Sequence, residues 1–478
     1  MNILFATSEC APFIKTGGLA DVAGALPKAL AGNGHDVRVI LPLYEGIGEE
    51  WRSQMTYLQC FHITLAWRSP YCGIFELKRD GVTYWFVDNE YYFKRPNIYG
   101  HYDDGERFAY FSRAVVESMG WLNWHPDVLH CNDWQTALVP IYLLEERHRI
   151  PQLCDTKSVF TIHNIEYQGR YGSQTLKDVF GLNDGYFNEH MLAYHGDVNL
   201  MKGAIYAADY VTTVSPTYAD ELQYSFYAHG REGVIADNRH KLRGILNGID
   251  TEVYDPWRDK GLTKFFSARQ MAGKKNCKAA LQQMSGLREN PDAPIIACAS
   301  RLVPHQGLDL APAATHEIMG MDVQMIVLGT GDWHYEEAFR QAQNQYPGRF
   351  AAHMMYSPNL STAIYGGADL FLMPSISEPC GLSQMIAMRY GTIPVVRETG
   401  GLRDSVVPYN KFTGEGTGFS FANINVQEMT GVLSEAVNLY HNEPKAWKAL
   451  QKNAMTADFS WEKSAKAYEE IYGWVTGK

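Results

Sequence analysis

The sequence contains no run of 18 apolar residues, so it offers no candidate for a helix that crosses a membrane. Its first residues have the pattern of a β-strand, whereas a secretory signal would begin with a basic segment followed by an apolar stretch and a cleavage site. We therefore expect a cytoplasmic protein with no membrane partner.

Paired cysteines and an excess of positive charge are also lacking. The eight cysteines include no Cys-x-x-Cys pair, which argues against a zinc cage or a small disulfide framework. The formal net charge is −11, whereas a nucleic-acid surface needs clustered Lys and Arg, so we expect no nucleic-acid partner. We expect no metal site, because the acidic pair at 103–104 has the pattern of a loop or a helix start.

A chain of 478 residues that is 46% hydrophobic is long enough for two large domains. Strand-like runs alternate with helical patterns in both halves, which predicts an α/β fold with two Rossmann-like, doubly wound domains facing a deep cleft. The strand-like runs cover 3–6, 37–41, 61–67, 73–77, 82–87, 127–130, 158–162, 209–215, 295–299, 323–328, 370–373 and 393–396, and the segment 244–250 closes the first half.

The predicted boundaries follow from this alternation. We place the first domain at 1–247 and the second at 248–457. An amphipathic helical pattern near the end of the chain predicts a separate C-terminal helix in the segment 458–478, and we expect it to pack back on the first domain. Helices are also predicted from near Asp21 to Leu30 and from Glu106 to about Met119.

A glycine-rich segment, KTGGL at 15–19, lies between the first strand and the first helix. The start of a helix attracts anions, Gly17 and Gly18 allow close approach of the backbone, and Lys15 adds a cation. The segment therefore predicts binding of a phosphate-bearing ligand, with an ordinary glycine turn and a solvated lysine as the alternative. It matches neither a Walker loop nor the Gly-x-Gly-x-x-Gly pattern.

Polar residues follow two of the predicted buried strands. Asn132 and Asp133 come soon after the strand at 127–130, and His163 and Asn164 follow the strand at 158–162. Open α/β sheets bind ligands at the carboxyl ends of their strands, so these residues are candidates for a site.

Several motifs, taken in order, resemble those of bacterial glycogen synthases and plant starch synthases over nearly the whole chain. They are KTGGLADV at 15–22, YDDGERFAYF at 102–111, HCNDWQT at 130–136, TIHNIEYQG at 161–169, TTVSPTYA at 212–219, LNGID at 246–250, LGTGD at 328–332, EPCGL at 378–382 and ETGGLRD at 398–404.

This resemblance implies the GT-B fold and a retaining glucosyltransferase. Such an enzyme moves glucose from ADP-glucose to the non-reducing end of an α-1,4-glucan such as glycogen, without a cofactor besides the donor substrate. The first domain then faces the acceptor and the second binds the nucleotide sugar. The sequence leaves the oligomeric state open.

The resemblance also implies roles for particular residues. Phosphate-binding positions of the family match Lys15, Gly17, Gly18 and Arg301, and the amides of Gly381 and Leu382 are expected to cap the diphosphate. Sugar-contacting positions match His163, Glu378, Asp133 and Asn247, and the aromatic position that stacks on adenine matches Tyr356. A purely structural role remains the alternative for Arg301 (a surface ion pair), for His163 (a hydrogen-bonded strand end), for Tyr356 (a core residue) and for the helix at 381–382.

The chain departs from the family pattern at three places in the second domain. Gln306 stands where the family has a catalytic lysine, Thr362 and Ala363 replace a usual His-Arg, and Ile376 and Ser377 replace a usual Arg-Phe. Losing a comparable transition-state stabiliser costs on the order of 10²–10³ in rate. Besides a slowed glycogen synthase, the sequence therefore allows two alternatives. One is a weak or inactive paralogue that binds glucan or nucleotide or regulates, and the other is an enzyme with a changed donor or acceptor.

Overall fold

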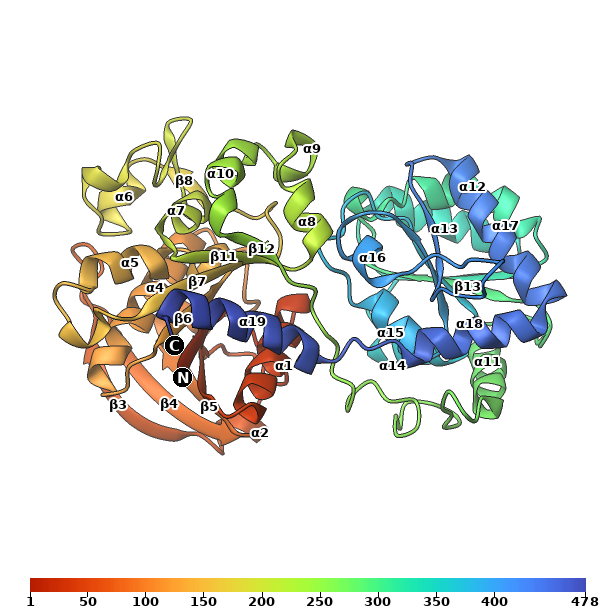
Figure 1. The fold of residues 1–478 in the computed structure, drawn as a ribbon, viewed down its shortest axis with the longest axis horizontal. Helices are drawn as coiled ribbons and strands as arrows, with labels where there is room; N and C mark the ends of the chain where they lie inside the picture. Colours follow the sequence, from red (N-terminus) through yellow and green to blue (C-terminus); the bar gives the residue numbers. More distant parts are fainter. The chain divides into compact units, whose positions relative to one another are not determined.

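The computed structural model describes residues 1–478, apart from the side chain of Gln152. The chain divides into two compact units. Unit 1 comprises Met1–Gly248 and Trp461–Lys478, and unit 2 comprises Ile249–Ser460. Each unit is built around a mainly parallel sheet with helices beside it, which confirms the predicted α/β class (Figure 1).

The elements of unit 1 are as follows. Its strands are β1 (Asn2–Ala6), β2 (Asp36–Pro42), β3 (Thr56–His62), β4 (Tyr71–Arg79), β5 (Val82–Asp88), β6 (Val128–Asn132), β7 (Lys157–Ile162), β8 (Arg170–Gly172), β9 (Ala193–Tyr194), β10 (Asp197–Asn199), β11 (Tyr210–Thr213) and β12 (Leu242–Gly244). Its α-helices are α1 (Gly18–Gly32), α2 (Glu49–Arg52), α3 (Glu90–Phe93), α4 (Asp104–Trp121), α5 (Leu138–Glu146), α6 (Thr175–Asp178), α7 (Leu200–Ala207), α8 (Pro216–Glu221), α9 (Ser225–Ala228), α10 (Glu232–Asp237) and α19 (Trp461–Thr476).

The large sheet of unit 1 has the strand order β12-β11-β7-β6-β1-β2-β5-β4-β3. The strands from β12 to β5 run parallel, and β4 and β3 add an antiparallel edge. From β1 the chain moves to β2 on one side and later to β6 on the other. The carboxyl ends of β1 and β6 therefore form a topological switch point, where such sheets bind ligands.

Two predicted boundaries in unit 1 are wrong. The strand expected at 61–67 ends at His62, and the chain then makes a tight turn closed by two hydrogen bonds between the backbones of Leu65 and Arg68. Ala66 within this turn has a positive φ of 54°, which an extended strand does not allow. The first helix begins at Gly18 instead of near Asp21, so the glycine pair forms its cap and its first residue.

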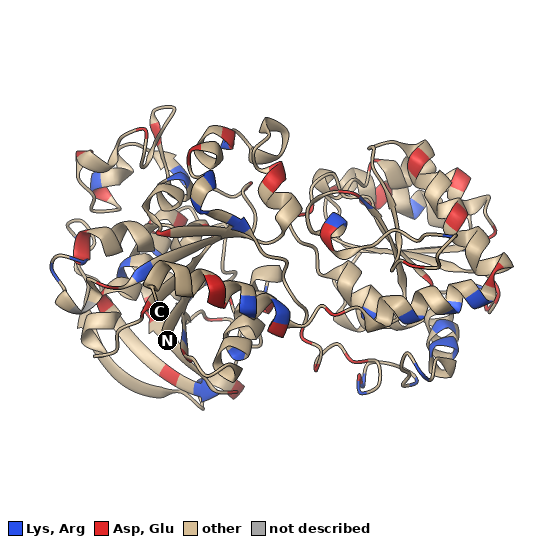
Figure 2. Cartoon of the chain, viewed as in Figure 1, with Lys and Arg blue, Asp and Glu red and all other residues tan. Residues whose placement is uncertain are grey.

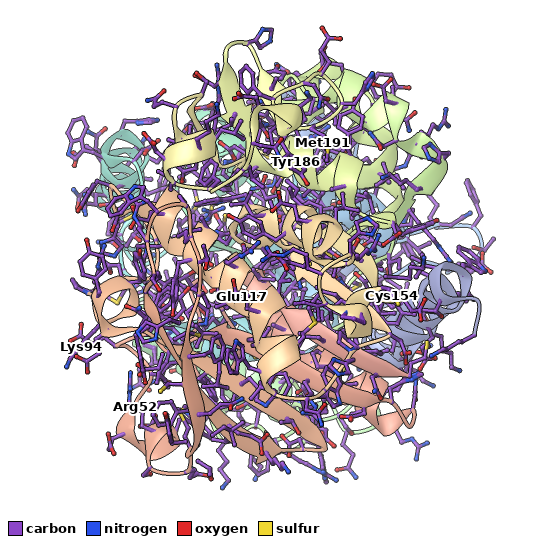
Figure 3. All side chains as sticks on the ribbon, turned by 90° about the vertical axis from the view of Figure 1, so that its left-hand side faces the viewer. Arg52, Lys94, Glu117, Cys154, Tyr186 and Met191 are labelled. Carbon is purple, nitrogen blue, oxygen red and sulfur yellow. The ribbon has the colours of Figure 1, made fainter. Side chains whose placement is uncertain are left out.

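Helix α4 is held against α5 by charge as well as by apolar packing. The Arg113 guanidinium contacts Glu117 on its own helix at 2.9 Å and Glu146 on α5 at 2.6 Å. Figure 3 views unit 1 from the side on which Glu117 is labelled. Because these groups are largely buried, the pairing compensates for the loss of hydration of three charges.

The C-terminal helix α19 belongs to unit 1. Ser464 Oγ donates to the carbonyl oxygen of Leu246 at 2.6 Å, and the Tyr472 hydroxyl is 2.6 Å from His130 Nδ1 in β6. The end of the chain returns close to Met1, and Figure 1 shows both termini in the same region of the unit. The helix thus covers strands whose carboxyl ends carry candidate site residues.

The elements of unit 2 form a second sheet with its own helices. Its strands are β13 (Ile295–Ala299), β14 (Gln324–Leu328), β15 (Phe350–His353), β16 (Leu370–Met373), β17 (Ile393–Arg397) and β18 (Phe419–Phe421). Its helices are α11 (Ala272–Met284), α12 (Leu310–Met319), α13 (Trp333–Gln345), α14 (Pro358–Gly367), α15 (Ser383–Arg389), α16 (Gly400–Ser405), α17 (Val426–Asn442) and α18 (Pro444–Thr456), with a 3₁₀ turn η5 at Pro304–Gln306.

All neighbouring strands of unit 2 run parallel, in the order β15-β14-β13-β16-β17-β18. The chain leaves β13 towards β14 on one side and later returns to β16 on the other. This places a second switch point at the carboxyl ends of β13 and β16. The strands are almost entirely buried, which explains their continuous apolar runs in the sequence.

Charged residues are distributed over the helices and loops of both units (Figure 2). Among the residues that the structure describes, no helix combines the length and the apolar character needed to cross a membrane.

Candidate active site

The glycine-rich loop of unit 1 connects β1 to α1 and is tied down by a carboxylate. Glu9 Oε2 accepts hydrogen bonds from the Thr16 N–H at 2.5 Å, the Thr16 hydroxyl at 2.9 Å and the Gly17 N–H at 3.2 Å. Lys15 Nζ lies 2.7 Å from Asp21 Oδ1 on α1. The loop therefore already holds one anion, while the first N–H groups of α1, from Gly18 onward, have no partner within the helix.

Asp133 and His163 follow β6 and β7 and are joined directly. Asp133 Oδ1 accepts the backbone N–H of His163 at 2.7 Å and that of Asn164 at 3.4 Å. Burial raises the pKa of Asp133 to about 7, although these two bonds act in the opposite direction. The backbone of Asp133 has φ 56° and ψ −178°, a conformation that residues other than glycine rarely adopt and that often occurs at functional sites.

The tautomer of His163 follows from its neighbours. Asn132 Nδ2 donates to the carbonyl oxygen of Ala6 at 2.9 Å, so Asn132 Oδ1 faces His163 Nε2, also at 2.9 Å. Nε2 must then carry the proton and donate it. Burial lowers the pKa of His163 to about 3, so the ring is neutral near pH 7 and contributes dipoles and hydrogen bonds, not charge.

Asn247 lies just beyond β12 and is buried. Its Oδ1 has no hydrogen-bond partner among the residues that the structure describes. A buried amide oxygen without a partner costs free energy, and such an atom can accept a hydrogen bond from a ligand hydroxyl. This observation supports the predicted contact with a sugar.

Glu378 lies at the switch point of the unit 2 sheet, after β16. Its Oε2 accepts hydrogen bonds from Gln306 Nε2 at 3.2 Å and from Ser375 Oγ at 3.1 Å. Burial raises the pKa of Glu378, and these two neutral donors and the charge of Arg301 counteract that effect. The structure thus brings the predicted residues Glu378, Gln306 and Arg301 together.

The loop after β13 is shaped by close backbone contacts. Gly307 has φ 68°, and a Cβ atom there would lie 1.8 Å from the carbonyl oxygen of Pro374. The His305 carbonyl accepts the N–H of Ile376 at 2.9 Å, while the His305 ring lies 3.3 Å from Arg301 Nη2. The segments after β13 and β16 therefore form one rigid surface that presents Gln306 to Glu378.

Tyr356 follows β15, and its side chain is 83% exposed. This exposure excludes the alternative of a core tyrosine and leaves the ring free to stack on a flat ligand. Gly381, with φ 68°, and Leu382 precede α15, which begins at Ser383, one to two residues later than predicted. The amides of Gly381 and Leu382 therefore lie at the start of this short helix.

Two contributors to these sites were missed by the sequence reasoning, Glu9 and Ser375, which fix site groups by hydrogen bonds. Asn132, a candidate because it follows a predicted strand, sets the tautomer of His163. The only signal for Glu9 is its position in the loop that also contains the glycine pair. Among the described residues, no group of three or more His, Cys, Asp or Glu side chains could hold a metal ion.

The chain is similar to known proteins over nearly its whole length. Residues 2–237 match the starch synthase catalytic domain family, and residues 270–455 match the glycosyl transferases group 1 family. The chain is 50% identical to a glycogen synthase of Geobacillus thermodenitrificans over 473 residues, which are 99% of this chain and 97% of that protein. It is 49% identical to a glycogen synthase of Bacillus cereus over 472 residues, 99% of each chain.

Solved structures show the same fold. The catalytic domain of starch synthase IV from Arabidopsis thaliana, bound to ADP and acarbose, has a TM-score of 0.92 and 35% identity, covering 100% of this chain and 99% of that one. Sucrose-phosphate synthase from Thermosynechococcus elongatus has a TM-score of 0.62 and 16% identity, covering 100% of this chain and 99% of that one. At this low identity, the likeness shows only that the two proteins share a fold.

The two parallel sheets with polar residues at their switch points define a glycosyltransferase of the GT-B fold, as predicted. Within that class, the chain belongs to the family of bacterial glycogen synthases and plant starch synthases. Its activity is the transfer of glucose from ADP-glucose to an α-1,4-glucan.

Proposed function

We propose that the protein extends the non-reducing end of glycogen with retention of configuration, and that Lys15, Arg301 and Glu378 act on the donor ADP-glucose. The observation that carries this assignment is the environment of Glu378. This carboxylate is partly buried at the switch point of the unit 2 sheet, and two neutral donors hold one of its oxygens. The other oxygen is then available to accept hydrogen bonds from the hydroxyl groups of the donor glucose.

In this proposal the bond between glucose C1 and the β-phosphate oxygen breaks, and its electron pair leaves with ADP. The acceptor O4 forms the new bond to C1, and its proton passes to the released phosphate oxygen. The protein stabilises the charge that develops on the diphosphate through Lys15, Arg301 and the N–H groups of Gly18, Gly381 and Leu382. The Gly17 N–H, which we expected to contact the diphosphate, is bonded to Glu9, so Gly17 contributes through loop shape.

The sugar is positioned by polar groups of unit 1 in the same proposal. His163 remains neutral and offers its backbone carbonyl near the anomeric carbon, and Asp133 holds the His163 backbone in place. Asn247 accepts a sugar hydroxyl at its unpartnered Oδ1. The exposed ring of Tyr356 stacks on the adenine of the nucleotide.

We place this activity in the cytoplasm, without a metal cofactor and without a nucleic-acid or membrane partner. The free thiol state of the cysteines supports the proposed cytoplasmic location. All eight are free thiols, and six of them are buried, as is usual for proteins kept in a reducing environment.

A second candidate function rests on Gln306. Because this amide brings no charge to Glu378, the protein could retain nucleotide or glucan binding with weak or no transfer. This candidate predicts tight ADP binding without turnover, whereas the leading proposal predicts both.

The variant Glu378→Gln tests the leading proposal, with Glu289→Gln as the matched control on the exposed surface of unit 2. We expect Glu378→Gln to lower kcat for glucose transfer by about 10²-fold or more while ADP binding changes little. Glu289→Gln is expected to match the unmodified protein. Equal loss of transfer and of ADP binding in Glu378→Gln would instead assign Glu378 to folding of the loop.

A further inference from the structure

Glu9 is a buried carboxylate that the transfer reaction does not use, and it lies in the loop assigned above to the diphosphate. It is only 3% exposed, and a single oxygen, Oε2, accepts all three hydrogen bonds from Thr16 and Gly17. Its other oxygen, Oε1, lies on the side of Gly17, 3.7 Å from the point that a Cβ atom would occupy on that glycine. Glu9 therefore fixes the conformation of the loop that precedes α1.

The charges around Glu9 are mostly negative. The negative charge of Asp21 on α1 raises the pKa of Glu9, and the charge of Glu9 raises the pKa of Asp133 after β6. The nearby cation Lys15 is bonded to Asp21 at 2.7 Å. Burial has raised the pKa of Glu9 above its ordinary value already, despite the three hydrogen bonds that favour the ionised form.

The remaining titratable neighbours are uncharged near pH 7. Burial raises the pKa of Cys10, Tyr44 and Tyr99, and the charge of Glu9 adds to this effect for each of them. None of the three can supply a positive charge to Glu9. These neighbours therefore do not offset the repulsion between Glu9 and a further negative charge in the loop, and protonation of Glu9 would remove it.

We propose that Glu9 is the positioning residue of the donor loop and that it takes up a proton when the diphosphate of the nucleotide binds. The proposal rests on the assignment of Lys15 and Gly18 to the diphosphate. Thr16 and Gly17 donate to Glu9, and Gly18 donates to the phosphate, so both anions share one short stretch of backbone. A like charge within about 6 Å favours the neutral carboxyl, and Oε1 is the oxygen free of backbone donors that can receive the proton.

The protonated side chain keeps its structural role. Oε2 remains an acceptor for the Thr16 and Gly17 N–H groups, because a neutral carboxyl retains acceptor capacity beside its O–H. The loop thus stays in place while its charge is removed. Affinity for ADP is expected to fall as pH rises, by up to about tenfold per pH unit, because one proton is taken up with each nucleotide.

Calorimetric titration with ADP tests this directly. We measure binding between pH 6 and pH 9 in buffers of different ionisation enthalpy, which yields the number of protons taken up. Glu9→Gln keeps the acceptor oxygen but cannot titrate, and Glu90→Gln on the exposed start of α3 is the matched control. Protonation of ADP itself is common to all variants and cancels in the comparison.

We expect the unmodified protein and Glu90→Gln to take up more protons than Glu9→Gln, and the pH dependence of ADP affinity to flatten in Glu9→Gln. The variant Asp133→Asn shows which carboxyl takes up the proton. Proton uptake persists in this variant if Glu9 receives the proton, and it disappears if Asp133 receives it. Glu9→Ala is expected to raise the KM for ADP-glucose at least tenfold, and Glu9→Gln to restore it.

Two results would overturn the proposal. One is the same proton uptake in Glu9→Gln as in the unmodified protein, and the other is no uptake in the unmodified protein beyond that of ADP. If the unmodified protein binds no ADP at all, the assignment of the loop to the diphosphate fails, and the proposal fails with it. Circular dichroism of each variant shows whether a loss of binding reflects unfolding.

Discussion

Replacing Gln306 by lysine should accelerate the enzyme. In the structure, Gln306 Nε2 donates a neutral hydrogen bond to Glu378 Oε2 at 3.2 Å. A lysine in its place would form a charge-assisted bond, which is roughly twice as strong, and would hold Glu378 in its ionised form. The same ammonium could reach the departing diphosphate, where the present amide supplies no charge.

The size of the effect follows from comparable groups. Removing one preorganised stabiliser of a developing anion costs on the order of 10²–10³ in rate. Some of that gain is offset here, because the lysine must be partly desolvated at this half-buried position next to Glu378. We therefore expect Gln306→Lys to raise kcat by about 10- to 100-fold, with a smaller effect on KM.

The assay measures the initial rate of ADP release at saturating ADP-glucose and glycogen. Gln345→Lys, at the exposed end of α13, adds the same charge away from the site and serves as the control. Gln306→Met removes the hydrogen bond without adding charge and should be slower than the unmodified enzyme. If kcat is the same in Gln306→Lys and in Gln345→Lys, the missing lysine does not limit the reaction, and our interpretation of Gln306 is wrong.

Three further predictions concern the loop, the pH response and the backbone. Lys15→Ala should lower kcat/KM for ADP-glucose by about 10²-fold, whereas the exposed Lys78→Ala should not; equal effects would remove Lys15 from the site. Burial raises the pKa of Asp133 from 3.8 to about 7, so the folded state loses stability as pH rises through this window. The Tm of Asp133→Asn relative to the unmodified protein should therefore increase by a few degrees between pH 4 and pH 8, and a constant difference would contradict this. Gly307→Ala should lower both stability and activity, because its Cβ would lie 1.8 Å from a carbonyl oxygen. Gly286→Ala, with a similar φ of 65° but open space around it, should cost only about 1–2 kcal/mol in the free energy of unfolding, and equal losses in both variants would show that φ alone is responsible.

The central strands of both sheets could be predicted because their sequences are continuous apolar runs. β6, β7, β13 and β16 are buried on both faces, and their predicted ranges agree with the structure to within two residues. The segment at 61–67 was misassigned because its alternation continues past the end of β3 into a tight turn. Alternation alone does not reveal a positive φ such as that of Ala66.

The site was partly predictable for a related reason. Polar residues directly after buried strands made Asp133 and His163 candidates, because topology brings strand ends together at one edge of a sheet. Arg301 came from the resemblance to the family. Glu9 was not identified, since its partners are backbone N–H groups and no sequence pattern records such bonds. The contact between Gln306 and Glu378 also joins segments more than seventy residues apart, which only the folded sheet brings together.

The incorporation of labelled glucose into glycogen tests the central claim most directly. The purified protein is incubated with ADP-[¹⁴C]glucose and glycogen, and the product is digested with an exo-acting enzyme that removes α-1,4-linked units from non-reducing ends. We predict incorporation well above a heat-killed control, with the label released by this digestion. Absence of incorporation above that control, in a protein that still binds ADP, would contradict the account and favour a binding role.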